Sequence, residues 1–156
     1  MPYEEINLAL QLITVAILAI GAYFGVRQLK ELSTQAKLNI FTTYTTRYSE
    51  IVSKLPAEVN INNRSVLVDL TAERRNELMG LFRKFFDLCS EEYYLFQEGL
   101  VNKKVWNLWT KGMEFHMESK SFQDAWSLVK GEGYDPNFVI FLEGLADYRG
   151  HQSKTL

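Results

Sequence analysis

This sequence is poor in cysteine, histidine and proline, and neither sign of charge dominates. Its single cysteine, Cys89, excludes an intramolecular disulfide and fits a reducing compartment. The formal net charge of −2 gives no global field that attracts nucleic acid, and no basic stripe stands out. The chain also lacks a P-loop, a G-x-G-x-x-G segment and a nucleophile elbow. We therefore expect no enzyme activity, no cofactor and no nucleic-acid binding.

The two histidines offer too few ligands for a metal site. His116 lies between Glu114 and Glu118, and the second histidine, His151, is in the C-terminal tail. A metal site needs further ligands at helical spacing, and the sequence supplies none. We expect His116 to be a surface or rim histidine and the protein to hold no metal.

Cys89 and the acidic pair that follows it are expected to be structural. Cys89 falls on an apolar helical stripe without a basic partner, which predicts a packed thiol rather than a nucleophile. Glu91 and Glu92 are adjacent, and adjacent helical residues point about 100° apart, so they rarely act together. We expect both carboxylates to lie on a solvated face.

The most conspicuous feature of the sequence is one long apolar run near its start. Residues 6–26, INLALQLITVAILAIGAYFGV, contain no charge. As an α-helix this run spans about 31 Å, close to the hydrocarbon thickness of a bilayer. A cleaved signal peptide would have a basic start and a shorter apolar region, and a helix buried in a soluble protein is rarely apolar all round for so long. We predict a transmembrane anchor.

The charges on either side of this run predict its orientation. Glu4 and Glu5 precede it, whereas three basic residues follow it. Basic residues are retained on the cytoplasmic side, so we expect a single-pass protein of the inner (plasma) membrane with its N-terminus outside. The basic residues are also expected to attract anionic lipids of the inner leaflet, by about 1 kcal/mol each. They are Arg27, Lys30 and Lys37.

One face of the predicted anchor carries polar and small side chains. Six positions at alternating spacings of four and three share a stripe: Asn7, Gln11, Thr14, Leu18, Gly21 and Gly25. Gly21 and Gly25 form a G-x-x-x-G motif, which lets helix backbones approach closely. We predict a homo-oligomeric interface at Leu18, Gly21 and Gly25. Two alternatives stay open for the polar positions: they line a small pore, or Asn7 and Gln11 merely lie near the outer headgroups.

Helical periodicity continues after the anchor, and no segment sustains a period of two. Residues 26–55 lack proline and glycine, so the helix is expected to continue and to stop before Pro56. Residues 56–70 are expected to form a loop with a short extended piece at Val66–Val68. Cap signals predict four further helices: between Thr71 and Gly99, after Asn102, from Ser121 to near Gly131, and from Asp135-Pro136 to just before Gly150.

The predicted fold class is all-α, with an N-terminal transmembrane helix that continues into a cytoplasmic helical bundle. We assign residues 1–26 to the anchor, 27–150 to the bundle and 151–156 to a tail. Eight tyrosines and three tryptophans exceed what a small helical core usually holds. Trp106, Trp109 and Trp126 could form a docking surface for a cytosolic protein partner, and core packing is the alternative.

The order of these aromatic segments resembles a bacterial family of short single-pass membrane proteins with a helical cytoplasmic domain of unknown function. The likeness rests on the N-terminal apolar helix and on five aromatic signatures: Phe41–Tyr48, E-E-Y-Y-L-F at Glu91–Phe96, V-W-N-L-W at Val105–Trp109, Phe122 and Trp126. These signatures are packing motifs, so the resemblance implies no activity.

A more distant resemblance is to the small membrane accessory proteins of RNA-targeting CRISPR systems. Those proteins share an N-terminal membrane helix before a compact HEPN-type bundle, and they assemble into membrane pores during antiviral defence. The HEPN ribonuclease motif, an arginine followed four to six residues later by a histidine, is missing here, because Arg149 and His151 are only two apart. Two functions follow: a non-enzymatic, self-associating membrane protein that binds or regulates a partner, or an oligomeric membrane-permeabilising effector.

Overall fold

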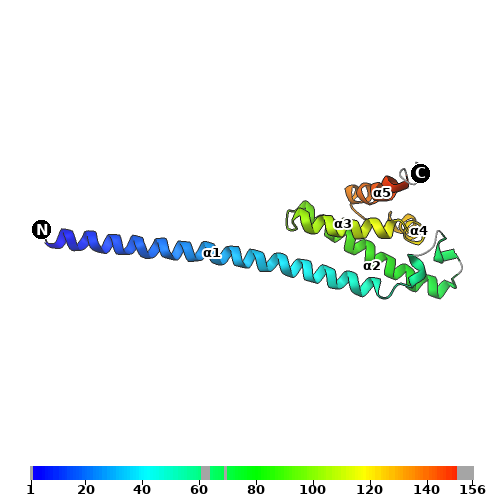
Figure 1. The fold of residues 1–156 in the computed structure, drawn as a ribbon, viewed down its shortest axis with the longest axis horizontal. Coiled ribbons are helices and arrows are strands. Elements are labelled where there is room, and N and C mark those ends of the chain that lie inside the picture. Colours follow the sequence, from blue (N-terminus) through cyan, green and yellow to red (C-terminus); the bar gives the residue numbers. More distant parts are fainter. Residues whose placement is uncertain (1, 61–63, 69, 151–156) are drawn as a thin grey trace. The chain divides into compact units, whose positions relative to one another are not determined.

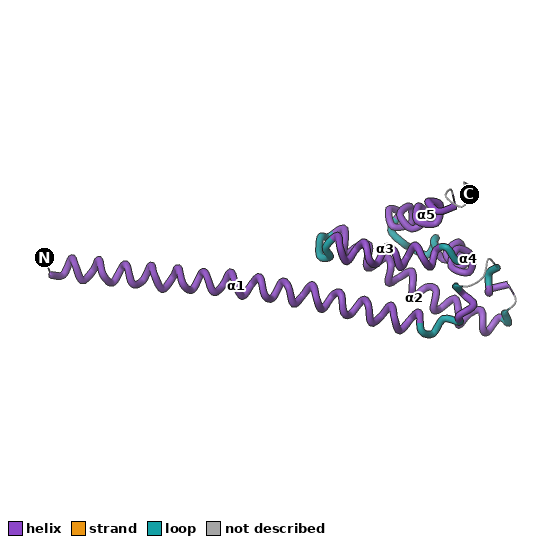
Figure 2. Tube along the Cα trace, in the orientation of Figure 1, coloured by secondary structure: helices purple, strands orange, loops and turns teal. Residues whose placement is uncertain are grey.

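The computed structural model describes residues 2–60, 64–68 and 70–150, and in these ranges the regular secondary structure is helical throughout (Figures 1 and 2). The all-α prediction is therefore confirmed. Side chains are described as far as Leu145. The elements are α1 (Pro2–Val52), the short 3-10 helices η1 (Ala57–Val59) and η2 (Val66–Val68), and then α2 (Ala72–Gln97), α3 (Lys103–Met117), α4 (Lys120–Val129) and α5 (Pro136–Gly150).

The chain divides into two units within α1. The first unit ends at Asn39 and the second begins at Ile40. In the first unit every residue from Tyr3 to Asn39 is exposed except Gly25, which is partly exposed. The division lies beyond residue 26, where the apolar run ends, because residues 27–39 are exposed as well.

The last part of α1 belongs to the second unit and supplies one wall of its core. Ile40, Tyr44, Tyr48 and Ile51 are partly buried against that core, at the helical spacing expected from the sequence. The helix ends at Val52, shortly before Pro56, as predicted. A proline ring clashes with the backbone of the preceding turn, so α1 cannot extend through Pro56.

The connection from residue 56 to residue 70 differs from the prediction of an extended piece. Val66–Val68 forms the 3-10 helix η2, and Leu67 is buried. Hydroxyl groups take the backbone donors that a strand partner would otherwise satisfy. Val66 N donates to Ser121 Oγ at 3.1 Å, and Leu67 N donates to Ser65 Oγ at 3.3 Å. Side-chain acceptors of this kind favour tight turns over extended backbone.

The predicted ends of α2 are confirmed. At its start, Thr71 Oγ1 accepts a hydrogen bond from Arg74 N at 3.4 Å. At its end, Gly99 has φ +67°, a conformation that favours glycine. The bonds from Leu100 N to Leu95 O and from Gly99 N to Phe96 O, both 3.0 Å, complete a Schellman motif.

The other predicted caps are confirmed for α3 and α5 and shifted for α4. Asn102 Oδ1 accepts from Lys104 N and Val105 N, both at 3.0 Å, and Asp135 Oδ1 accepts from Asn137 N at 2.8 Å. The cap of α4 is Ser119, not Ser121, because the buried Ser121 hydroxyl already serves η2. Gly150 is the last residue of α5 rather than the residue beyond it.

An aromatic cluster forms the centre of the second unit. Helix α2 packs against α3 and α4, and α3 also packs against α5. Phe82, Phe85 and Phe86 of α2 surround Phe122 of α4 at ring-centroid distances of 4.8, 4.8 and 6.2 Å, all edge-to-face. This arrangement sets the positive ring edges against the negative ring faces, and it fixes α4 on α2.

Candidate functional site

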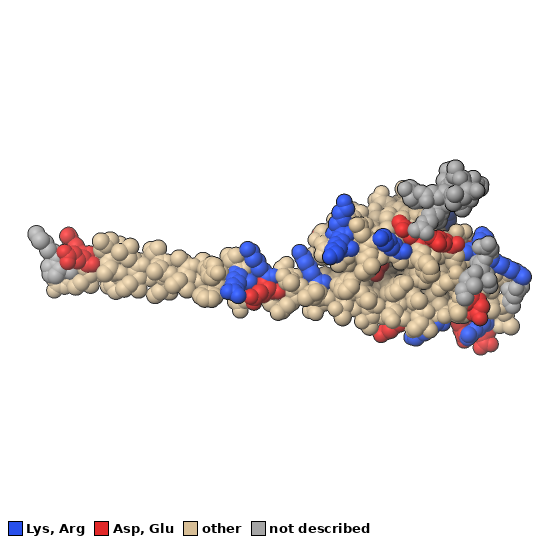
Figure 3. Space-filling view, viewed as in Figure 1, with Lys and Arg blue, Asp and Glu red and all other residues tan. Residues whose placement is uncertain are grey.

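The first candidate site is the apolar part of α1. Among the described residues, α1 is the one helix long and apolar enough to cross a membrane, judged by length and composition. None of its most apolar window is buried against the rest of the chain. Figure 3 shows acidic side chains at the start of α1, an uncharged stretch, and then a cluster of charges. The coarse prediction, a long apolar N-terminal helix, is confirmed.

The predicted stripe along this helix occupies a narrow sector. With about 100° per residue, the six positions from Asn7 to Gly25 fall within about 80° of the helix circumference. Thr14 Oγ1 is satisfied inside the helix, because it donates to Leu10 O at 2.9 Å. Asn7 and Gln11 have no side-chain hydrogen bond to any residue that the structure describes. The unsatisfied polar groups are therefore concentrated in the first two turns of the stripe.

Gly21 and Gly25 have no conformational role in the isolated chain. Neither has the positive φ that requires glycine, and a Cβ added at either position would meet nothing within 4 Å. A glycine inside a helix costs about 0.5–1 kcal/mol relative to alanine. The local structure offers no compensation for that cost, whereas close approach of a second helix would.

The three basic residues that follow the apolar run are all exposed. Arg27 pairs with Glu31 in its own helix, with Arg27 Nε 3.5 Å from Glu31 Oε1. Lys30 and Lys37 are exposed on the same helix. An exposed pair of this type contributes little to stability, so Arg27 remains available to other partners at small cost.

The structure places the three tryptophans in the core. Trp106 stacks on Phe96 of α2 with a centroid distance of 4.6 Å, and Trp109 lies 5.5 Å from Tyr44 of α1. Trp126 packs against Phe86 at 4.9 Å. All three side chains are buried, so their rings do not provide the exposed docking surface, and the core-packing alternative describes them.

His116 is buried, which corrects the expectation of a surface or rim position. Its ring lies among Phe85, Phe122 and Tyr48. Tyr48 Oη is 2.8 Å from His116 Nε2, and His116 Nδ1 is 3.0 Å from Asn60 Oδ1. Burial lowers the pKa of His116 to about 4, so the ring is neutral at pH 7. The neutral ring that donates from Nδ1 and accepts at Nε2 satisfies both contacts.

Glu91 and Glu92 lie in opposite environments, which corrects the expectation of a shared solvated face. Glu91 is exposed and receives two hydrogen bonds from Arg47, at 2.5 and 3.0 Å, and one from Tyr44 Oη at 2.9 Å. The Arg47 guanidinium lowers the pKa of Glu91. Glu92 is only 4% exposed, and burial raises its pKa to about 8. The two carboxyl groups therefore differ in charge at neutral pH.

Glu92 lines a cavity of about 360 Å³ within the second unit. The cavity lies among α1, α2 and α3, and its other walls are mainly aromatic and apolar. They include Phe41, Tyr48, Phe85, Trp109 and Met113. Cys89 also lines the cavity; it is buried, and burial raises the pKa of its thiol well above the usual value, so it is a packed thiol as predicted.

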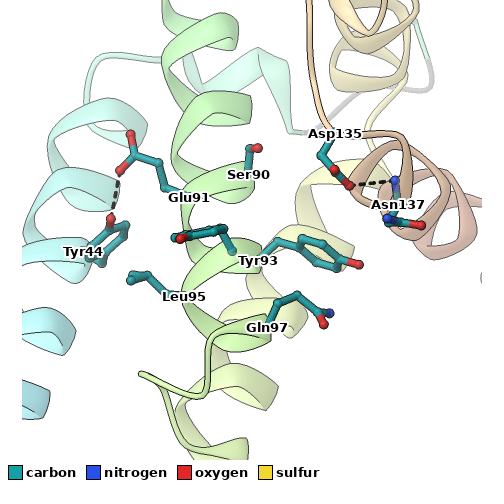
Figure 4. Close-up of a pocket in the computed structure, with 9 residues that line it drawn as sticks. Tyr44, Ser90, Glu91, Tyr93, Leu95, Gln97, Asp135 and Asn137 are labelled. Carbon is teal, nitrogen blue, oxygen red and sulfur yellow. Dashed lines mark hydrogen bonds between the residues drawn. The ribbon is translucent and has the colours of Figure 1, made fainter.

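A second hollow, which Glu91 lines, is larger and more polar. It has a volume of about 930 Å³ and is drawn in Figure 4. Two of its polar contacts are Tyr44 with Glu91, and the Asp135 carboxylate with the backbone of Asn137. These bonds hold α1 to α2 and cap α5, so this hollow is explained by structural contacts.

Within the part of the chain that the structure describes, no three histidine, cysteine or acidic side chains gather as metal ligands. No family model, curated protein or solved structure matches this chain. The resemblances drawn from the aromatic segments therefore stay predictions. The function proposed below is supported by the chain's own geometry.

Proposed function

We propose that the protein is a non-enzymatic, single-pass membrane protein that self-associates through the stripe around Gly21 and Gly25. Its helical domain lies in the cytoplasm and binds or regulates a cytosolic protein. One observation supports the proposal above all others. An apolar helix is exposed on every side, and its two glycines lie on one stripe without any role inside the chain.

The apolar side chains and the glycines of this helix need different partners. Lipid covers apolar side chains without further help, because lipid tails are as apolar as leucine. Lipid does not reward a glycine, which exposes backbone and offers little contact area. A second copy of the helix does so, since backbones that approach closely gain van der Waals contact along the whole stripe.

The partner surface of the helical domain is assigned to residues other than the tryptophans. Leu108 and Phe115 lie seven residues apart on α3, and each exposes more than half of its side chain. Residues at this spacing share a helix face, and we propose this exposed apolar face of α3 as the contact surface for the partner. The orientation with the N-terminus outside follows the basic residues Arg27, Lys30 and Lys37.

The test is the oligomeric state of the full-length protein in mild detergent, measured by light scattering. Replacing both Gly21 and Gly25 with leucine should convert a discrete assembly to monomer. Replacing Ala9 and Ala16 with leucine adds bulk to the opposite face of the same helix and should leave the assembly intact. If the two double variants behave alike, or the unmodified protein is monomeric, the proposed interface does not exist.

A second function, an oligomeric membrane-permeabilising effector of an antiviral defence system, is supported by Asn7 and Gln11. Both side chains lack a partner within the described chain and share the stripe with the glycines. Replacing both with leucine should abolish depolarisation of cells that express the protein while leaving the assembly unchanged. Depolarisation that persists in this variant would exclude these residues as a pore lining.

A further inference from the structure

The cavity beside Glu92 combines apolar walls with one buried acidic side chain. Its walls are aromatic and apolar, with Phe41, Tyr48, Phe85 and Trp109 among them. Its volume of about 360 Å³ lies in the range of small-molecule sites. Into this apolar space the chain places one carboxyl group, that of Glu92, on a residue that is 96% buried.

Glu92 has no hydrogen-bond partner among the residues that the structure describes. Two of the donors near it are already used. Arg47 is held by two bonds to Glu91, and the Tyr48 hydroxyl is paired with His116. Buried acidic residues are almost always paired.

We propose that this cavity binds a small organic cation, in which an ammonium group is joined to an apolar or aromatic body. The ammonium group would form an ion pair with Glu92 and supply the donor that this carboxyl group lacks. The faces of Trp109 and Tyr48 carry negative charge density, and they attract a cation placed beside them. The apolar body would fill the remaining space against Phe41, Phe85 and Met113.

Binding of the cation should depend on pH, because Glu92 takes up or releases a proton. The charged and titratable groups around Glu92 are Arg47, Glu91, Tyr48, Cys89 and, on the wall formed by α3, Lys111. Without a ligand Glu92 is mostly protonated at pH 7, because burial raises its pKa to about 8. A cation binds the carboxylate form, so binding must release a proton below pH 8. Apparent affinity should therefore rise about fifty-fold from pH 6 to pH 8 and less than twofold from pH 8 to pH 9.

The experiment is a calorimetric titration of the full-length protein in detergent micelles with 2-phenylethylammonium, at pH 6, 7, 8 and 9. The matched neutral probe is 2-phenylethanol, which has nearly the same size and cannot form an ion pair. We expect the ammonium compound to bind with the pH dependence above and to bind at least tenfold more tightly than the alcohol at pH 8. Equal affinities for the two probes, or no binding of either, would overturn the proposal.

Two substitutions locate the binding. Glu92→Gln keeps the size of the side chain and should remove both the preference for the cation and the pH dependence. Gly112 lines the cavity, and a Cβ at this position meets open space, so Gly112→Leu should block the site while Gly112→Ala keeps it. Tryptophan fluorescence and helical circular dichroism show whether each variant is folded. A folded Glu92→Gln variant that binds the ammonium probe as tightly as the unmodified protein would contradict the assignment.

Discussion

The two units of this chain contain similar apolar side chains in opposite surroundings. Between Ile6 and Val26 the large aliphatic residues expose more than half of their side chains, whereas Phe82, Phe86 and Phe122 in the second unit are fully buried. The difference lies in the pattern rather than in the composition. Around α2 the apolar residues occupy one stripe that other helices cover, while the first part of α1 exposes apolar side chains all round apart from the narrow stripe that holds Asn7, Gln11 and Thr14. A helix of the second kind needs lipid or further copies of itself.

The largest expected effect comes from placing charges in the first unit. Ile13→Arg combined with Ile17→Arg should release the protein from membranes, because each arginine near the centre of a span costs about 2.5–3.5 kcal/mol. The readout is the fraction that stays in the membrane pellet after alkaline carbonate extraction. Leu29→Arg with Leu32→Arg, which lie beyond the apolar run, should leave that fraction unchanged. Equal retention of both variants would show that the apolar run is not an anchor.

The next effect comes from removing one aromatic ring from the second unit. Phe122→Ala should lower the free energy of unfolding by about 3–5 kcal/mol, since the ring is fully buried among three other phenylalanines. Phe115→Ala removes the same atoms from an exposed position and should change it by less than about 1 kcal/mol. Urea unfolding followed by tryptophan fluorescence measures both, because all three tryptophans lie in the second unit. Similar losses in the two variants would contradict the packing described.

The smallest of the three effects depends on pH. The folded state raises the pKa of Glu92 from 4.5 to about 8, so the contribution of Glu92 to stability is complete below pH 4.5 and is lost as the pH rises to 8. The folded state lowers the pKa of His116 from 6.5 to about 4, so its contribution is complete above pH 6.5 and is lost towards pH 4. Between pH 4.5 and 6.5 the contributions of Glu92 and His116 to the free energy of unfolding change in opposite directions. Above pH 6.5, of these two contributions, only that of Glu92 still changes.

The unfolding free energy should therefore fall by about 2 kcal/mol between pH 6.5 and pH 8, at about 1.4 kcal/mol for each pH unit. Glu92→Gln should remove this fall and expose the opposite slope of His116 at lower pH. The measurement is the same urea titration repeated at half-unit steps of pH. A fall of equal size in the Glu92→Gln variant would assign the titration to a different group.

Local signals in the sequence were sufficient for most of the fold. Thr71, Asn102 and Asp135 cap helices as predicted, because a cap depends on only four or five neighbouring residues. The cap of α4 was misplaced by two residues, since the choice between Ser119 and Ser121 depends on η2, which is more than 50 residues away. Contacts over such distances are not visible in a local pattern.

The candidate sites were predicted unevenly for the same reason. The stripe from Asn7 to Gly25 follows directly from helical geometry, so its residues share a face as expected. The buried position of Glu92 was missed, although a signal was present: Phe85, Cys89 and Glu92 are spaced by four and three, as core positions are. The burial of His116 carried the same signal, because Trp109, Met113 and His116 are also spaced by four and three, whereas its hydrogen-bond partners Tyr48 and Asn60 come from distant segments that a local pattern does not show.

Because Cys89 is buried, the rate at which its thiol is modified reports on the state of the second unit. Its thiol is 2% exposed and lines the cavity beside Glu92, and burial disfavours the reactive thiolate, so alkylating reagents and oxidants should reach it slowly, either through that cavity or when the second unit opens. The rate of its modification then reports access to the cavity and opening of the fold together, without denaturant. A molecule seated in the neighbouring cavity would slow the same reaction. The modification rate of this single thiol can thus report both the opening of the fold and the occupancy of the cavity.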